Sequence, residues 1–108
     1  MSTFDKREEA FEKKYALDEE QKFKATARRN RKLGAWAAEK LGLSSAEADA
    51  YAKAVVAADF EEAGEDDVFR KVRSDLDAKG IKDVSDSEIR DKMAELLATS
   101  AAEVKAGT

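Results

Sequence analysis

Four basic side chains, Arg28, Arg29, Arg31 and Lys32, lie within five residues and are the residues best suited to bind a phosphate group. Because guanidinium groups donate several charged hydrogen bonds to phosphate oxygens, Arg28, Arg29 and Arg31 are candidate phosphate contacts. A short basic run on a helix more often forms a solvated face or pairs with acidic side chains. The net charge of −4 and the lack of a Gly-rich loop argue against a nucleic-acid partner.

Two runs of carboxylates, at residues 18–20 and 65–67, are the candidates for binding a divalent cation. Neither run has the ligand spacing of an EF-hand loop. Acidic side chains at the start of a helix interact favourably with the helix dipole, which explains residues 65–67 without a metal. We therefore expect no metal site, and no particular carboxylate pair stands out for acid–base catalysis.

The 108 residues include no cysteine and no histidine. Their absence excludes disulfides, thiol nucleophiles, Cys/His zinc sites and imidazole catalysis. We therefore expect a protein that is not an enzyme and has no cofactor, although a bound nucleotide stays compatible with the basic cluster. No apolar stretch is long enough to span a bilayer, and the N-terminus has no signal or transit pattern. These features predict a cytoplasmic protein without direct membrane insertion.

Helix start and stop signals divide the chain into four helical stretches. Glycines that typically follow the last residue of a helix occur at Gly42, Gly64 and Gly80. Capping boxes at residues 44–47 and 85–88 predict the starts of the second and fourth stretches. The connections are short, which favours antiparallel neighbours and predicts an all-α four-helix bundle.

Apolar residues recur at helical spacing in each predicted stretch, the third of which begins near Asp66. They are Leu33, Trp36, Ala37 and Leu41, then Ala48, Tyr51, Ala52, Val55 and Val56, then Val68, Phe69, Val72 and Leu76, and finally Ile89, Met93, Leu96, Leu97 and Val104. Trp36 is the largest of them, so we expect it to fill the centre of the bundle.

The N-terminal part of the chain differs from the rest. Its first 33 residues contain no Gly and no Pro, and Phe4, Phe11 and Tyr15 fall within about 40° of one another around a helix. We divide the chain into an interaction arm at residues 1–22, helical but mobile when free, and a helical bundle at residues 23–108. An amphipathic helix packed on its own bundle would show the same stripe, so the pattern alone leaves both interpretations open.

Charge divides the chain at a later point, after residue 32. Residues 1–32 hold ten Lys and Arg against seven Asp and Glu, a net charge of +3, and residues 33–108 carry a net charge of −7. A positively charged N-terminal part on a negatively charged body suits an acidic docking surface on a partner protein.

The chain also resembles a known family over nearly its whole length. The resemblance lies in residues 4–23 (FDKREEAFEKKYALDEEQKF), 23–43 (FKATARRNRKLGAWAAEKLGL), 50–72 (AYAKAVVAADFEEAGEDDVFRKV) and 89–96 (IRDKMAEL). These segments are similar to the zeta-subunit inhibitors of alphaproteobacterial F-type ATP synthases. The motifs ARRN, LGAWAAEKLG and GEDDVFRKV are the most specific part of the likeness.

The resemblance implies a four-helix protein whose N-terminal segment inserts into the catalytic head of the synthase. The segment would occupy a catalytic alpha/beta interface beside the central gamma stalk and block rotation during ATP hydrolysis. The residues implied as partner contacts are Phe4, Asp5, Arg7, Glu8, Phe11, Glu12, Lys14, Tyr15 and Phe23. This chain departs from the family at Leu17, where many members have histidine.

Two other functions stay open at this point. One is a small regulatory module that binds nucleotide or phosphate through Arg28, Arg29 and Arg31. The other is an interaction scaffold that affects no enzyme. Deleting residues 1–20 separates these functions, because the inhibitor would lose its function with its fold intact, whereas the phosphate binder would keep it. Substituting the basic cluster should do the reverse.

Overall fold

The structure, a computed structural model, describes residues 17–58 and 66–107, and these residues form four helices. The helices are α2 (Glu19–Leu41), α3 (Ser45–Ala58), α4 (Asp66–Ala78) and α5 (Asp86–Ala106). No strand occurs in these two ranges. The predicted all-α four-helix bundle is therefore confirmed.

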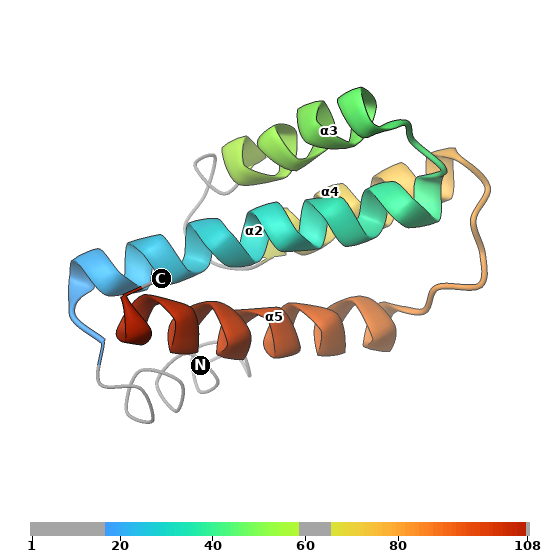
Figure 1. The fold of residues 1–108 in the computed structure, drawn as a ribbon. Helices are drawn as coiled ribbons and strands as arrows, with labels where there is room; N and C mark the ends of the chain where they lie inside the picture. Colours follow the sequence, from blue (N-terminus) through green and yellow to red (C-terminus); the bar gives the residue numbers. More distant parts are fainter. Residues whose placement is uncertain (1–16, 59–65, 108) are drawn as a thin grey trace.

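Successive helices run in opposite directions, and α2 lies at the centre of the arrangement (Figure 1). Helix α2 packs most extensively against α3 on one side and α5 on the other, with α4 behind it. The end of α5 returns to the start of α2, so both ends of the described chain lie at the same end of the molecule (Figure 1).

The predicted helix ends at residues 41–47 are confirmed in detail. Gly42 has φ 73°, a left-handed conformation that favours glycine, and its N–H donates to the carbonyl oxygens of Ala38 and Glu39. At the start of α3, the Glu47 N–H donates to Ser44 Oγ at 3.3 Å, and the Ser44 N–H donates to Glu47 Oε1 at 3.0 Å. The stop predicted at Gly64 lies outside the described residues.

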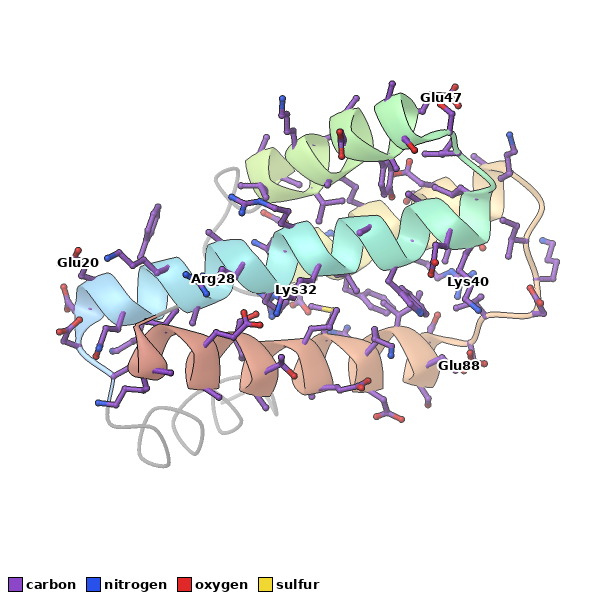
Figure 2. The ribbon with its side chains drawn as sticks, viewed as in Figure 1. Glu20, Arg28, Lys32, Lys40, Glu47 and Glu88 are labelled. Atoms are coloured by element: carbon purple, nitrogen blue, oxygen red, sulfur yellow. The ribbon has the colours of Figure 1, made fainter. Side chains whose placement is uncertain are left out.

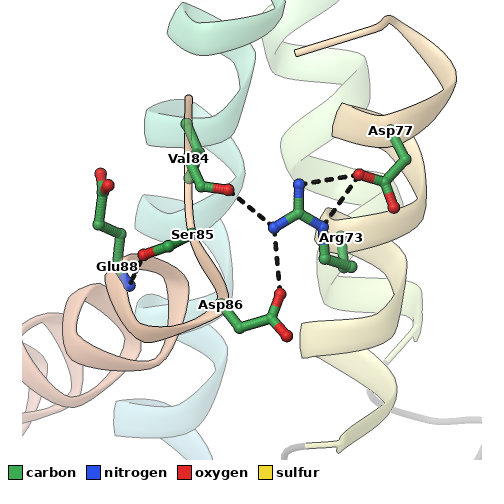
Figure 3. A network of polar contacts seen from close by, with 6 residues as sticks. All are labelled: Arg73, Asp77, Val84, Ser85, Asp86 and Glu88. Atoms are coloured by element: carbon green, nitrogen blue, oxygen red, sulfur yellow. Dashed lines mark hydrogen bonds and ion pairs between the residues drawn. The ribbon is translucent and has the colours of Figure 1, made fainter. Parts of the chain in front are cut away.

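The connection between α4 and α5 is held by a single arginine (Figure 3). Arg73 Nη1 donates to the Val84 carbonyl oxygen at 2.8 Å and to Asp86 Oδ1 at 3.1 Å, while Nη2 donates to Asp77 Oδ1 at 2.9 Å. Beside it, Ser85 Oγ accepts the Glu88 N–H at 3.1 Å, as the predicted cap requires. These bonds fix where α5 begins relative to α4.

The core is formed by apolar side chains from all four helices and the α4–α5 connection. Its buried members are Leu33, Ala37, Leu41, Val55, Val68, Val72, Leu76, Val84, Ile89 and Met93. Trp36 is only partly buried and packs against this cluster, with Lys40 Nζ 5.8 Å from its ring centroid, so the prediction of a central tryptophan is wrong. Trp36 lies about 100° from Ala37 around the helix, which turns its ring away from the centre.

The start of α2 is set by a capping box that was not predicted from the sequence. Asp18 is extended at φ −78°, ψ 176°, and caps the helix. Its Oδ1 accepts the Gln21 N–H at 2.7 Å, and Gln21 Oε1 accepts the Asp18 N–H at 3.2 Å. This capping box starts α2 at Glu19, so the arm–bundle boundary predicted after residue 22 falls inside α2. The signal was present as an aspartate followed three residues later by a glutamine.

The Asp18 cap can be tested directly. We expect Asp18→Ala to lower the free energy of unfolding by about 1 kcal/mol, because it leaves the N–H groups of the first turn without their acceptor. Asp18→Asn keeps an acceptor oxygen and is the matched control, which we expect to stay close to wild type. Urea unfolding followed by circular dichroism measures both, and equal losses in the two variants would mean that charge matters more than the cap.

Candidate functional site

The predicted partner contacts lie mostly outside the described residues. Those outside are Phe4, Asp5, Arg7, Glu8, Phe11, Glu12, Lys14 and Tyr15. Phe23 lies in the second turn of α2 and is 60% exposed, the largest apolar side chain that the described part of the body presents to solvent. This exposure is compatible with the predicted partner contact at Phe23, which stays a prediction.

The segment that precedes α2 is anchored at Leu17. This side chain is 8% exposed and packs in a small cluster with Ala25 of α2 and Ala101 of α5, against which the partly buried Val104 also packs. Leu17 acts as an apolar contact that holds the base of the arm against the end of α5.

The basic cluster predicted on α2 makes an ionic contact with α5 (Figure 2). Lys32 Nζ lies 2.7 Å from Glu103 Oε2, and Arg28 Nη1 lies 3.4 Å from Glu103 Oε1. The hydrogen bond from Lys32, with that from Arg28, lowers the pKa of the Glu103 carboxyl below its ordinary value. Two of the four basic residues thus help to join helices within the body.

Because the folded-state pKa of Glu103 is lowered, its contribution to stability is present above the unfolded pKa of about 4.5 and is lost as the pH falls through the folded pKa. We expect Glu103→Gln to reduce the free energy of unfolding at pH 7 and to have little effect at pH 2–3, where the wild-type carboxyl is protonated. Urea unfolding at the two pH values measures this. A loss of equal size at both would show that the ion pairs are not its cause.

The three candidate phosphate contacts do not come together. Arg28 pairs with Glu103, Arg29 is 2% exposed with its Nε donating to Asn30 Oδ1 at 2.6 Å, and Arg31 is exposed on the side of α2 that faces α3. Neighbouring helical residues lie 100° apart, so a run of basic residues need not form one surface. The arrangement assembles no shared phosphate site from Arg28, Arg29 and Arg31.

Two features of the structure were not predicted from the sequence. Asn30 and Ser100 are buried, and the amide nitrogen of Asn30 and the hydroxyl of Ser100 have no hydrogen-bond partner among residues 17–58 and 66–107. The second feature is an open hollow of about 380 Å³ between α2 and α3. Its lining residues are Arg31, Asp49, Ala52, Lys53 and Val56. No spacing rule would have brought these residues together, because the approach of two helices creates the hollow.

Among residues 17–58 and 66–107, no three carboxylate, histidine or cysteine groups gather where they could hold a metal ion. None of the four described helices is both long and apolar enough to cross a bilayer. The fold defines the class: a small helical protein whose described residues form four helices.

Comparison with known proteins supports this class and narrows it. The sequence model of the family described as ATPase inhibitor subunit zeta matches residues 1–103. The chain belongs to this family. It is also similar to a protein whose solved structure is described as the "Solution NMR structure of the protein". That chain is 50% identical, with a TM-score of 0.68, and the match covers 80% of this chain and 96% of that one. A search of curated proteins finds no significant match.

Proposed function

We propose that the chain inhibits ATP hydrolysis by an F-type ATP synthase and that residues 4–23 are its inhibitory segment. This segment enters a catalytic alpha/beta interface of the enzyme head beside the gamma stalk and blocks rotation in the hydrolysis direction. The protein then acts as a regulatory subunit without catalytic activity or cofactor, in the cytoplasm, where the head of the enzyme lies.

The observation that carries this proposal is the extent of the family match, which begins at residue 1 and so includes the arm. Two features of the body agree with it. The capping box at Asp18 starts α2, so insertion of the preceding residues does not require α2 to unwind. Phe23, the predicted contact nearest to the body, is 60% exposed and lies where the same partner can reach it.

Ordering the arm on the partner has a free-energy cost of about 2–5 kcal/mol, which the buried aromatic side chains must exceed. The favourable binding free energy comes mainly from Phe4, Phe11 and Tyr15, because aromatic side chains contribute most at interface hot spots. The charged residues between them set the orientation of the segment.

The test is ATP hydrolysis by the purified cognate catalytic head, titrated with the full chain and with a chain that lacks residues 1–16. This deletion keeps Leu17 and the Asp18 capping box, so it spares the base of the body. We expect the full chain to inhibit and the shortened chain to have no effect at the same concentrations. Inhibition by both would place the activity in the body, and inhibition by neither would refute the proposal.

A further inference from the structure

Arg31 of α2 and Lys53 of α3 are exposed cations at the same place in the fold. Both line the hollow between the two helices, together with the side chains of Ala52 and Val56. Neither forms an ion pair or a side-chain hydrogen bond within the described parts of the chain. By contrast, Arg28, Lys32 and the other paired cations of the body each lie within 4.0 Å of a carboxylate.

The rest of the hollow is suited to an apolar contact. Ala52 is buried and Val56 is partly buried, so the floor is made of small aliphatic groups, and the carboxylate of Asp49 lines it as well. The three ionisable groups, Arg31, Lys53 and Asp49, give the hollow a net charge of +1. Two exposed cations beside an apolar floor favour a partner that carries carboxylates, because opposite charges across an interface attract each other.

The hollow also lies beside the exposed end of α2. Helix α2 continues past the C-terminal end of α3 (Figure 1). Phe23 lies in the second turn of α2 and is 60% exposed. Phe23 and Arg31 are eight residues apart, about 12 Å along the helix, which is a span that one helix of a partner can contact. The surface therefore has an aromatic group at one end and two cations at the other.

We propose that this α2–α3 hollow is a second docking surface for the ATPase head and that it receives an acidic helical segment with an apolar side chain between its carboxylates. The carboxylates pair with Arg31 and Lys53, and the apolar side chain contacts Ala52 and Val56. This inference rests on the proposed function, since it gives the body a role in holding the enzyme while the arm inserts. The hollow then contributes to the affinity for the ATPase head, and the arm blocks rotation.

Charge reversal tests the hollow in the full chain. We expect the double variant Arg31→Glu, Lys53→Glu to raise the half-inhibitory concentration about tenfold and to leave the inhibition at saturation unchanged. The matched control is Lys79→Glu, Lys82→Glu, which makes the same change in net charge at exposed residues around the α4–α5 connection. We expect this control to stay within about twofold of wild type, as surface charges usually contribute little. Thermal unfolding of both variants checks that the fold is kept.

A binding measurement separates this inference from the proposed function. The chain has no cysteine, so Ala57→Cys at an exposed position of α3 carries one fluorophore next to the hollow. We expect its emission to change when the catalytic head is added, and the charge reversal to weaken that change at low salt more than at high salt. A signal that depends on Arg31 and Lys53 without inhibition would support the hollow and refute the inhibitory function. If the charge-reversal and control variants behaved equally in both assays, the hollow would not be a docking surface for the head.

Discussion

Gly34→Ala is expected to lower the free energy of unfolding by about 2 kcal/mol, although alanine is the better helix former. Gly34 lies in α2 where this helix packs against α3. A Cβ atom built at this position would lie 2.6 Å from the Ala52 Cα atom and 3.1 Å from the Ala52 Cβ atom. The shorter of these distances is to a backbone atom, so no side-chain rotation relieves the clash, and the two helices must move apart.

The sign of the change distinguishes packing from helix propensity. If propensity alone acted, replacing an interior glycine by alanine would raise the stability by about 1 kcal/mol. Overpacking costs typically about 1–3 kcal/mol in a close-packed interface, and the α2–α3 interface is one of the two most extensive in the body. We therefore expect packing to dominate.

Two variants complete this test in urea unfolding. Ala35→Gly changes an exposed neighbour on the same helix and reports propensity alone, with an expected loss of about 1 kcal/mol. Ala52→Gly combined with Gly34→Ala relieves the clash with the Ala52 methyl group but leaves the clash with the backbone of residue 52, so we expect only partial recovery. A Gly34→Ala protein more stable than wild type would show that α3 can shift at no cost.

Phe11→Ala is expected to raise the half-inhibitory concentration of the full chain about 30-fold or more, with the free energy of unfolding unchanged. An aromatic residue that anchors an interface costs about 2 kcal/mol or more when truncated, which corresponds to this factor. Phe11 is the central member of the stripe with Phe4 and Tyr15, and central residues of an interface lose the most water on binding.

ATP hydrolysis by the catalytic head and urea unfolding of the free protein, measured on the same preparations, give the two quantities. Phe11→Leu is the conservative variant, and we expect it to recover part of the inhibition because it restores most of the apolar area. A fall in stability that matched the fall in inhibition would identify Phe11 as a core residue of the bundle. The aromatic stripe would then belong to the protein's own packing.

Local signals in the sequence were enough to place most helix ends. The boundaries at Gly42, Ser44 and Ser85 follow from groups within four residues of one another, and each is confirmed. The buried positions of α4, Val68, Val72 and Leu76, follow from helical spacing in the same way. The capping box at Asp18 has the same local character and was available to sequence reasoning, which did not predict it.

Side-chain surroundings were less predictable, because they depend on which helix lies opposite. Trp36 was expected at the centre but lies at the edge of the core, since α2 directs Leu33 and Ala37 there. Arg28 and Arg29 are one residue apart, yet one reaches a carboxylate on α5 and the other is buried.

What the sequence by itself determined is the helical class, the ends of the helices and the charge difference between residues 1–32 and residues 33–108. These depend on backbone capping and on a 3.6-residue period, both of which act over a few residues. Only the tertiary structure decided that residue 34 must lack a Cβ atom because Ala52 packs against it, and that Arg31 and Lys53 line the same hollow. It also decided that Leu17 packs against α2 and α5 and so holds the base of the arm. Each of these depends on the distance between two helices, which is set by the packing of whole surfaces and not by any local pattern.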